Sequence, residues 1–255
     1  MLRPVLIALA VAALATPALA ADEEIQVYMD EMSETGQFGL DVHLNYVPDG
    51  IGTAGYPGEQ DPTHRLRVTP EWSYGLTPNL ELGAYLPLAT LDRDGHFLVG
   101  GAKARLKFSA PKAEGQTWFW GLNFEIGRVR RALDINPWNA ELKGIYGFRS
   151  GPWTVALNAN LDWTVSGPQP APASLEIATK VSYRVRQGLA LGIETYNGVG
   201  DFDRFGRFGE SDQSTYAVID KTFGKWDLNL GVGRGYGASV DRWILKAVVG
   251  VPIDG

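Results

Sequence analysis

The chain has 255 residues, a formal net charge of −6 and no cysteine. A chain without cysteine has no disulfides, no thiol catalysis and no cysteine metal sites. The mild negative charge, with both signs interspersed, gives no reason to expect nucleic acid as a partner. Glycine (31 residues) and aromatic residues (11%) are abundant while hydropathy is moderate, which is unlike a soluble helical protein.

The first twenty residues have the order of a secretory signal peptide. Arg3 gives a positive start, residues 5–15 are almost wholly apolar, and Ala18-Leu19-Ala20 is a small-x-small pattern before an expected cleavage at Ala21. The apolar run is shorter than the about twenty residues of a spanning helix, so a signal peptide over 1–20 is favoured over an N-terminal anchor. We therefore expect the chain to be exported.

From Gln37 onward, apolar and polar residues alternate with a period of two. The alternating runs are 38–46, 65–74, 80–88, 102–109, 117–126, 138–148, 153–163, 175–185, 189–194, 213–222 (the least clear), 226–232 and 242–251. Most are longer than a soluble strand of about 5–6 residues and match a tilted membrane-spanning strand of about 9–11. In the third run, Leu80, Leu82, Ala84, Leu86 and Leu88 are all expected to face lipid.

The connections between these runs alternate between long and short. The long ones are 48–63, 90–99, 128–137, 165–173, 197–212 and 236–241, and the short ones are 76–78, 110–116, 149–152, 186–188 and 223–225. Outer-membrane barrels have long external loops and short periplasmic turns. Residues 37–255 are therefore predicted to form an all-β, antiparallel up-and-down transmembrane barrel of about 12 strands in the outer membrane of a Gram-negative bacterium.

All eight tryptophans fall on the apolar side of the runs, near run ends, as in the two aromatic girdles of a membrane barrel. They are Trp72, Trp118, Trp120, Trp138, Trp153, Trp163, Trp226 and Trp243. A soluble sandwich would bury its tryptophans in mid-strand instead.

The charged side of the runs is predicted to face the lumen, because each Lys or Arg on the lipid face costs about 2–4 kcal/mol near the midplane. Lys221 and Arg242 are assigned to the lumen on the same grounds. A basic ladder that selects anionic or carboxylated solutes is expected from Arg65, Arg67, Lys103, Arg105 and Lys107. The luminal acids include Glu71, Glu81, Glu125 and Glu141. The favoured alternative is that these groups form a lumen-filling ion-pair network.

Two functions remain open at this point. The first is a narrow channel for passive uptake of small polar or aromatic organic solutes. The second is a closed structural or surface-interaction barrel that acts through its external loops. In both cases the expected partners are outer-membrane lipid, lipopolysaccharide and the barrel-assembly machinery, and no cofactor is expected.

Five segments have a recognisable pattern: EIQVY (24–28), GQFGLDVHLN (36–45), LRVTPEWSYG (66–75), GRG (233–235), and DRW (241–243) with Lys246. Together they resemble uncharacterised proteobacterial outer-membrane proteins grouped with the MetA-pathway phenol-degradation family, a transporter-like set. The resemblance implies a barrel and uptake of small organic solutes, and it supplies no catalytic residues. Residues 21–36 are read as a periplasmic arm or a plug that enters the lumen, because an even strand number disfavours a thirteenth strand.

An outer-membrane hydrolase is a less favoured alternative. The chain has three histidines, His43, His64 and His96, and lacks a G-x-S-x-G motif. Two acidic motifs, Asp92-x-Asp94-Gly95 and Asp201-x-Asp203-x-x-Gly206, have partial calcium-loop spacing but no later bidentate glutamate. They are interpreted as solvated loop charges, and no metal site is predicted.

Overall fold

The structure is a computed structural model that describes residues 24–51, 54–206 and 208–253. The predicted signal peptide, residues 1–20, lies outside the described residues. The strands are β1 (Phe38–Gly50), β2 (Leu66–Thr77), β3 (Leu80–Leu91), β4 (Phe97–Ser109), β5 (Trp118–Val129), β6 (Trp138–Ser150), β7 (Trp153–Ser166), β8 (Ser174–Arg186), β9 (Leu189–Asp201), β10 (Arg204–Phe205), β11 (Asp212–Phe223), β12 (Trp226–Gly237) and β13 (Asp241–Gly250).

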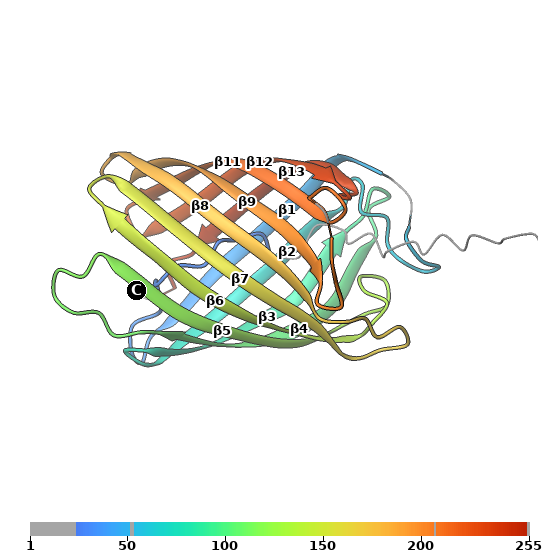
Figure 1. The fold of residues 1–255 in the computed structure, drawn as a ribbon, viewed down its shortest axis with the longest axis horizontal. Helices are drawn as coiled ribbons and strands as arrows, with labels where there is room; N and C mark the ends of the chain where they lie inside the picture. The colour runs from blue at the N-terminus through green and yellow to red at the C-terminus, as the bar shows by residue number, and fades with distance from the viewer. Residues whose placement is uncertain (1–23, 52–53, 207, 254–255) are drawn as a thin grey trace, which may run out of the picture.

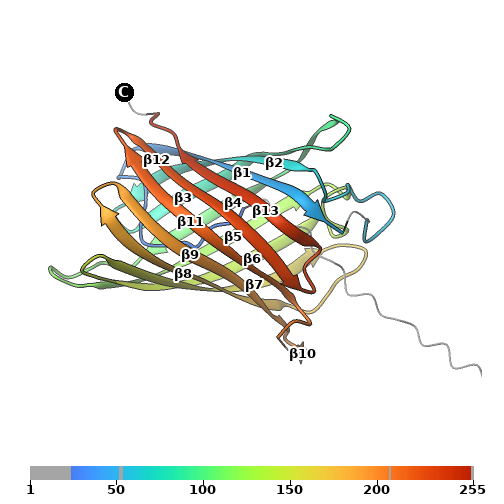
Figure 2. The ribbon, with the colours of Figure 1, turned by 90° about the horizontal axis from the view of Figure 1, so that it is seen from above.

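These strands form one antiparallel sheet that closes on itself (Figure 1). Apart from β10, each strand pairs with the strand before it and the strand after it, and β13 completes the ring by pairing with β1. The two-residue strand β10 pairs only with β9 and lies beyond the ring (Figure 2), so twelve of the thirteen strands make the barrel. The predicted twelve-stranded antiparallel barrel is confirmed. No helix in the described part of the chain is long and apolar enough to cross a membrane.

The two ends of the barrel differ in their connections. The long-loop end carries 51–65, 92–96, 130–137, 167–173, 202–211 and 238–240, and the short-turn end carries 78–79, 110–117, 151–152, 187–188 and 224–225. An up-and-down order puts alternate connections at opposite ends, so the alternation seen in the sequence corresponds to the two mouths of the barrel.

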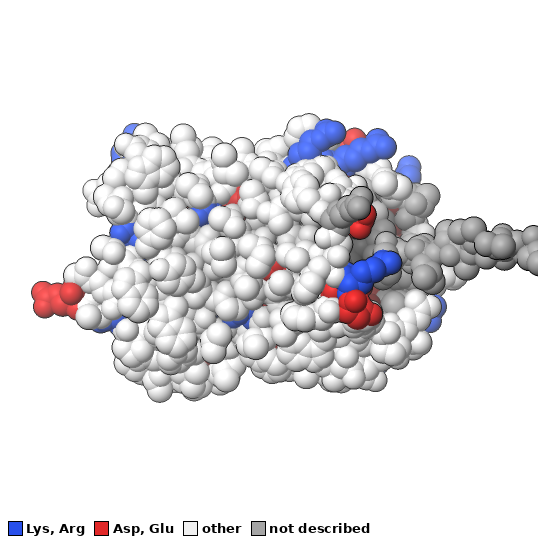
Figure 3. Space-filling view, in the orientation of Figure 1, with Lys and Arg blue, Asp and Glu red and all other residues white. Residues whose placement is uncertain are grey.

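The outer and inner faces have opposite chemistry. Leu106, Leu122 and Leu157 point outward with 41–44% of their surface exposed, whereas Asn123 and Asn158 point inward and are fully buried. Figure 3 shows a middle band almost free of charge, with Lys, Arg, Asp and Glu gathered toward the ends. Apolar side chains exposed in such a band are stable only against hydrocarbon, which is why the sequence alternates as it does.

Three sequence-based assignments of side-chain direction are wrong. Leu88 is 1% exposed and faces inward, because a register shift between Tyr85 and Leu88 reverses the alternation of β3. Lys221 pairs with two lipid-facing leucines at the short-turn end, and its ammonium group reaches backbone carbonyls there. The Arg242 side chain is 59% exposed at the long-loop rim rather than in the lumen.

Residues 24–30 lie inside the barrel, and residues 31–36 continue to its short-turn end (Figure 1). The segment meets the wall at the short-turn end, where the Gly36 N–H donates to the Gly75 carbonyl and Thr35 forms an isolated bridge with Gly75. It then runs inward to Ile25, which is buried against residues of β1, β11 and β13. Apart from that bridge, the described part of the segment joins no strand.

Candidate functional site

One side chain of the barrel wall holds the backbone of Tyr28. The Tyr28 N–H donates to Asn158 Oδ1 at 2.6 Å, and Asn158 Nδ2 donates to the Tyr28 carbonyl at 2.9 Å. A primary amide offers a donor and an acceptor in one plane, so it satisfies both backbone groups of a residue without a strand partner. The Tyr28 hydroxyl hydrogen-bonds the Tyr85 hydroxyl, which in turn donates to Glu125 Oε1 at 3.1 Å. Tyr28 is therefore fixed at both its backbone and its phenol.

Three cations of the wall surround the Tyr28 ring. Lys143 Nζ lies 4.2 Å, Lys107 Nζ 5.1 Å and Arg105 Cζ 5.8 Å from the ring centroid. A ring face attracts a cation more strongly when both are removed from water. The face of the Tyr28 ring thus helps to stabilise the positive charges of Lys143, Lys107 and Arg105 inside the barrel.

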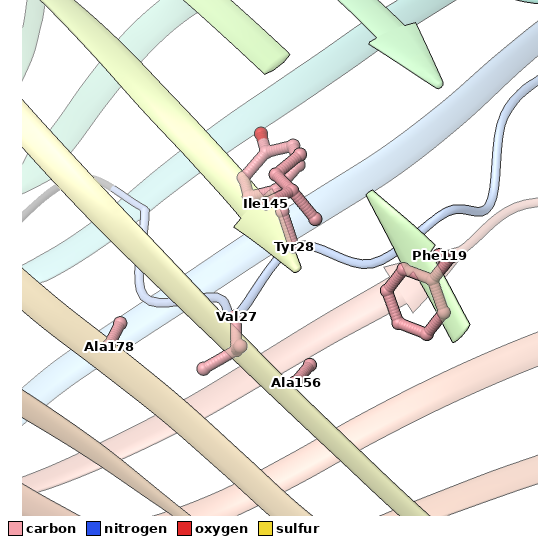
Figure 4. Close-up of a cluster of buried hydrophobic side chains, with 6 residues drawn as sticks. All are labelled: Val27, Tyr28, Phe119, Ile145, Ala156 and Ala178. Atoms are coloured by element: carbon pink, nitrogen blue, oxygen red, sulfur yellow. The ribbon is translucent and has the colours of Figure 1, made fainter. Parts of the chain in front are cut away.

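Apolar contacts hold the segment at two levels. Figure 4 shows Val27 and Tyr28 packed among Phe119, Ile145, Ala156 and Ala178 of the wall. Ile25 lies deeper, against Val47, Tyr216, Val218 and Ile244. The lumen is therefore not uniformly polar, because it carries apolar patches that match the apolar residues of the segment.

Sequence reasoning missed these inward apolar residues, although one signal was present. Phe119 breaks the alternation between two lipid-facing tryptophans, and it turns inward to a buried position (1% exposed). Its space is provided by Gly147, where a Cβ would lie 2.2 Å from the Phe119 ring. Gly233 makes the same kind of space for Tyr216, also at 2.2 Å. An aromatic residue that breaks the apolar–polar alternation and lies opposite a glycine on the next strand therefore indicates a side chain that points inward.

The structure divides the predicted basic ladder into two groups. Arg105 and Lys107 lie together on β4 at the level of Tyr28, and Lys103 is half-buried on the same strand. Arg65 and Arg67 are buried near the long-loop end, where Arg65 Nη1 donates to the Gln60 carbonyl at 2.9 Å. The strand β3 separates β2 from β4, so the five cations do not form one continuous row.

Acidic partners and the inner segment occupy the cations of β4. Arg105 Nη2 lies 2.7 Å from Glu71 Oε1 and 2.8 Å from Glu81 Oε1. Lys107 Nζ donates to the carbonyl of Glu31 at 2.6 Å. Paired charges of this kind hold structure more readily than they attract a passing ion.

The four predicted luminal acids all find partners. Glu71 receives a bond from the His43 ring at 2.9 Å in addition to Arg105, and Glu81 accepts from the backbone N–H of Ser33 in the inner segment. Glu125 accepts from Tyr85 and from Asn123 at 2.7 Å, while Glu141 is 3.0 Å from Lys143. All four carboxylates thus bind side chains of the barrel wall or the backbone of the inner segment.

A second charged cluster, which sequence reasoning did not single out, lies between β8, β9, β11 and β13. Glu194 binds Lys246 and lies 3.2 Å from Lys180, which also lies 2.8 Å from Asp220. Lys246 Nζ additionally donates to the carbonyl of Ile25 at 2.9 Å. The last strand of the barrel therefore anchors the deep end of the inner segment.

Ion pairs anchor the segment at the short-turn end. Asp30 binds Lys112 and lies 2.7 Å from Arg149, and Arg149 also lies 2.8 Å from Glu31. Burial tends to raise the pKa of the Asp30 carboxyl, but the hydrogen bonds from Arg149 and Lys112 outweigh it and hold that pKa below its ordinary value. Asp30 is therefore charged while the segment is docked.

The connection 51–65 reaches across part of the long-loop mouth. The Gln60 N–H donates to the carbonyl of Ala132 at 2.8 Å, and the Tyr56 hydroxyl donates to the carbonyl of Arg131 at 2.7 Å. The Gln60 side chain also accepts from Thr90 at 2.6 Å. These bonds tie the first long connection to the one between β5 and β6.

The tryptophans lie on the outer face, mostly near strand ends. Seven are 40–49% exposed and Trp163 is half-buried. Trp118, Trp153 and Trp226 begin their strands at the short-turn end, and Trp138 begins its strand at the long-loop end. Trp72 lies further in, five residues before the end of β2, and donates to the Leu86 carbonyl at 3.2 Å.

The three histidines, which were considered for a Ser–His hydrolase site, contact Glu71, Tyr46 and Asp92. Within the described residues, His43 binds Glu71 in the lumen, His64 contacts the Tyr46 hydroxyl at 3.2 Å, and His96 lies 3.1 Å from Asp92. The Asp92 carboxylate also accepts from the backbone N–H groups of Asp94 and His96. It therefore stabilises its own turn.

A closed twelve-stranded ring with an apolar outer band and a largely polar lumen is the fold of an outer-membrane β-barrel. No protein-family model and no curated protein matches this chain. Solved structures do match it. The COG4313 outer-membrane channel from Pseudomonas putida F1 aligns with a TM-score of 0.58 and 17% identity, over 89% of this chain and 99% of that one.

Two further matches are porins. The KdgM porin in complex with disordered oligogalacturonate aligns with a TM-score of 0.57 and 10% identity, over 85% of this chain and 99% of that one. The NanC porin aligns with a TM-score of 0.55 and 9% identity, over 83% of this chain and 97% of that one. At these identities the similarity establishes a shared fold.

Proposed function

We propose that this protein is an outer-membrane channel for passive uptake of small polar or aromatic organic solutes, with a lumen narrowed by its own residues 24–36. Side chains fill an eight-stranded barrel, and sixteen or more strands leave an open channel, so twelve strands leave an intermediate space. The observation that carries the proposal is that the segment in this space is not a strand of the barrel wall. Side-chain contacts, rather than a run of strand pairing, hold that segment.

The long-loop end is proposed to face outward and the short-turn end the periplasm, as in outer-membrane barrels generally. The apolar band would then contact lipid, with lipopolysaccharide around the long loops and the assembly machinery as a partner during insertion. The resemblance to the MetA-pathway group agrees with organic solutes as cargo. The lumen offers carboxylates, ammonium groups and tyrosine rings, which suit polar or aromatic solutes.

Conductance in planar bilayers tests the channel. Folded protein should give small unitary currents above the protein-free background, and liposome swelling should be faster with small neutral or carboxylated organic solutes than with large sugars. A folded sample that passes no current at any salt concentration would contradict the proposal.

A closed barrel that acts through its loops is the second candidate, favoured by the contacts of the inner segment with the wall and by the bonds of the 51–65 connection. Residues 197–201 belong to β9 and residue 212 to β11, so the loop can be shortened only within 202–211. If the closed barrel is correct, shortening this loop should abolish the surface interaction and leave the background-level conductance unchanged.

A further inference from the structure

A basic aromatic patch lies on the outer face at the long-loop ends of β12 and β13. Arg234 and Tyr236 come from β12, and Arg242 and Trp243 from β13. These four residues, here called the rim patch, are all exposed. Figure 3 shows Lys and Arg gathered at this end of the visible face, beside the uncharged band.

The sheet places Arg234 directly across from Trp243, and Arg242 is the next residue along β13. The Arg234 guanidinium lies 5.2 Å from the Trp243 ring. The Tyr236 hydroxyl is fixed at 3.2 Å from Thr215 Oγ1 on the neighbouring strand. The patch is therefore built on rigid strands rather than on a loop.

The charge of the patch is only weakly neutralised. Asp49 is the acid that the structure places beside it, with its carboxylate 3.9 Å from Arg242 Nη1 and both side chains more than half exposed. An exposed pair at this separation contributes little binding energy. The Arg234 guanidinium lies over the Trp243 ring, and the residue is exposed.

The surface directly beside the arginines is apolar. Val232 and Leu245 continue the outer face toward the middle of the barrel, with 51% and 42% of their surface exposed. They are paired across the same two strands as Arg234 and Trp243. A ligand on this face would thus meet guanidinium groups at one end and a hydrocarbon-facing surface at the other.

We propose that the rim patch binds the phosphorylated head group of an outer-leaflet glycolipid. Guanidinium groups match phosphate oxygens with paired hydrogen bonds, and an arginine held against a ring is already oriented. Tryptophan and tyrosine favour the boundary between head groups and acyl chains. The adjoining apolar surface points to a lipid rather than a free phosphate. The inference requires the membrane-embedded barrel proposed above but does not require the lumen to conduct.

Native mass spectrometry of the full-length barrel in detergent tests this site. The protein is offered an equimolar mixture of diphosphorylated lipid A and the same lipid without phosphates. Wild-type protein should retain the phosphorylated form about tenfold more than the other. The double variant Arg234→Gln/Arg242→Gln should lose this preference and still bind both forms weakly through its apolar surface.

Arg186→Gln is the matched control, because Arg186 is an exposed arginine at the short-turn end of β8. It should keep the wild-type preference. Arg234→Lys keeps the charge but loses the paired N–H donors of the guanidinium, so the ratio of phosphorylated to unphosphorylated lipid retained should be intermediate. Folding of each variant is checked by its heat-modifiable migration in gels. Equal retention of the two lipids by wild type, an unchanged preference in the double variant, or full displacement by millimolar inorganic phosphate would each overturn the proposal.

Discussion

Asn158 of β7 makes two hydrogen bonds to the backbone of Tyr28, a residue 130 positions earlier in the chain. Asn158→Ala removes both bonds. At roughly 0.5–1.5 kcal/mol for each bond, the undocked state of the segment should become about tenfold more populated. We therefore expect more frequent or larger openings in single-channel recordings.

Asn160→Ala is the control for this variant. Asn160 lies two residues along the same strand, faces the same lumen and donates to Glu176 at 2.9 Å instead of to the segment. Its conductance should match that of the wild type. If Asn158→Ala and Asn160→Ala behave alike, the amide of Asn158 does not hold the segment.

The ion pairs of Asp30 predict a dependence on pH. The pKa of Asp30 in the docked segment lies below its ordinary value of 3.8, so its stabilising contribution is complete above that value. The contribution is lost as the pH falls through the docked pKa, and conductance should rise when the short-turn side is acidified below about pH 4.

Asp30→Asn should show the raised conductance already at neutral pH, and this part of the acid response should disappear. Asp94→Asn, in the exposed 92–96 connection, should leave the response intact. A wild-type conductance that stays constant through the acid range would contradict the role given to Asp30.

Glu194 is buried between two lysines, and its removal should cost stability. In Glu194→Gln the charges of Lys180 and Lys246 lose their shared partner, and breaking a buried ion pair costs about 3–5 kcal/mol. We expect a lower free energy of unfolding in urea titrations of the barrel in lipid vesicles. Glu114→Gln, on the exposed 110–117 turn, should change it by less than about 0.5 kcal/mol.

The absence of cysteine permits a direct test of orientation. Single variants Asp94→Cys and Glu114→Cys place one thiol at the long-loop end and one at the short-turn end, both at exposed positions. A membrane-impermeant maleimide added to intact cells should label only the first, and both should react after the cells are lysed. The reverse pattern would invert the proposed topology.

The sequence was sufficient to predict the barrel because the lipid imposes a strict rule on every strand. An outward position must be apolar, so alternation, strand length and loop order all indicate the same ring. The rule fails where the register slips. Leu88 was assigned to the lipid face by continuing the alternation of β3 through a register shift that reverses it. Lys221 was assigned to the lumen because it is charged, but its ammonium group reaches backbone carbonyls at the edge of the membrane.

The lumen was harder to predict because inward positions obey no such rule. Acids and bases could be assigned to it, but their partners depend on how the strands are staggered. Arg105 is neutralised by Glu71 and Glu81 from two other strands, which spacing along the chain does not reveal. The sequence of residues 24–36 also does not indicate that Asn158 and Lys246 bind this segment, because both residues are remote from it in the chain.

The bond from Lys246 to the Ile25 carbonyl also links the inner segment to the strand that closes the ring. Lys246 belongs to the strand that is synthesised last, whereas Ile25 precedes the strand that is synthesised first. The inner anchor of the segment therefore requires the last strand of the barrel. Closure of the seam between β13 and β1 and full docking of the inner segment both depend on β13, and a chain truncated before β13 lacks both.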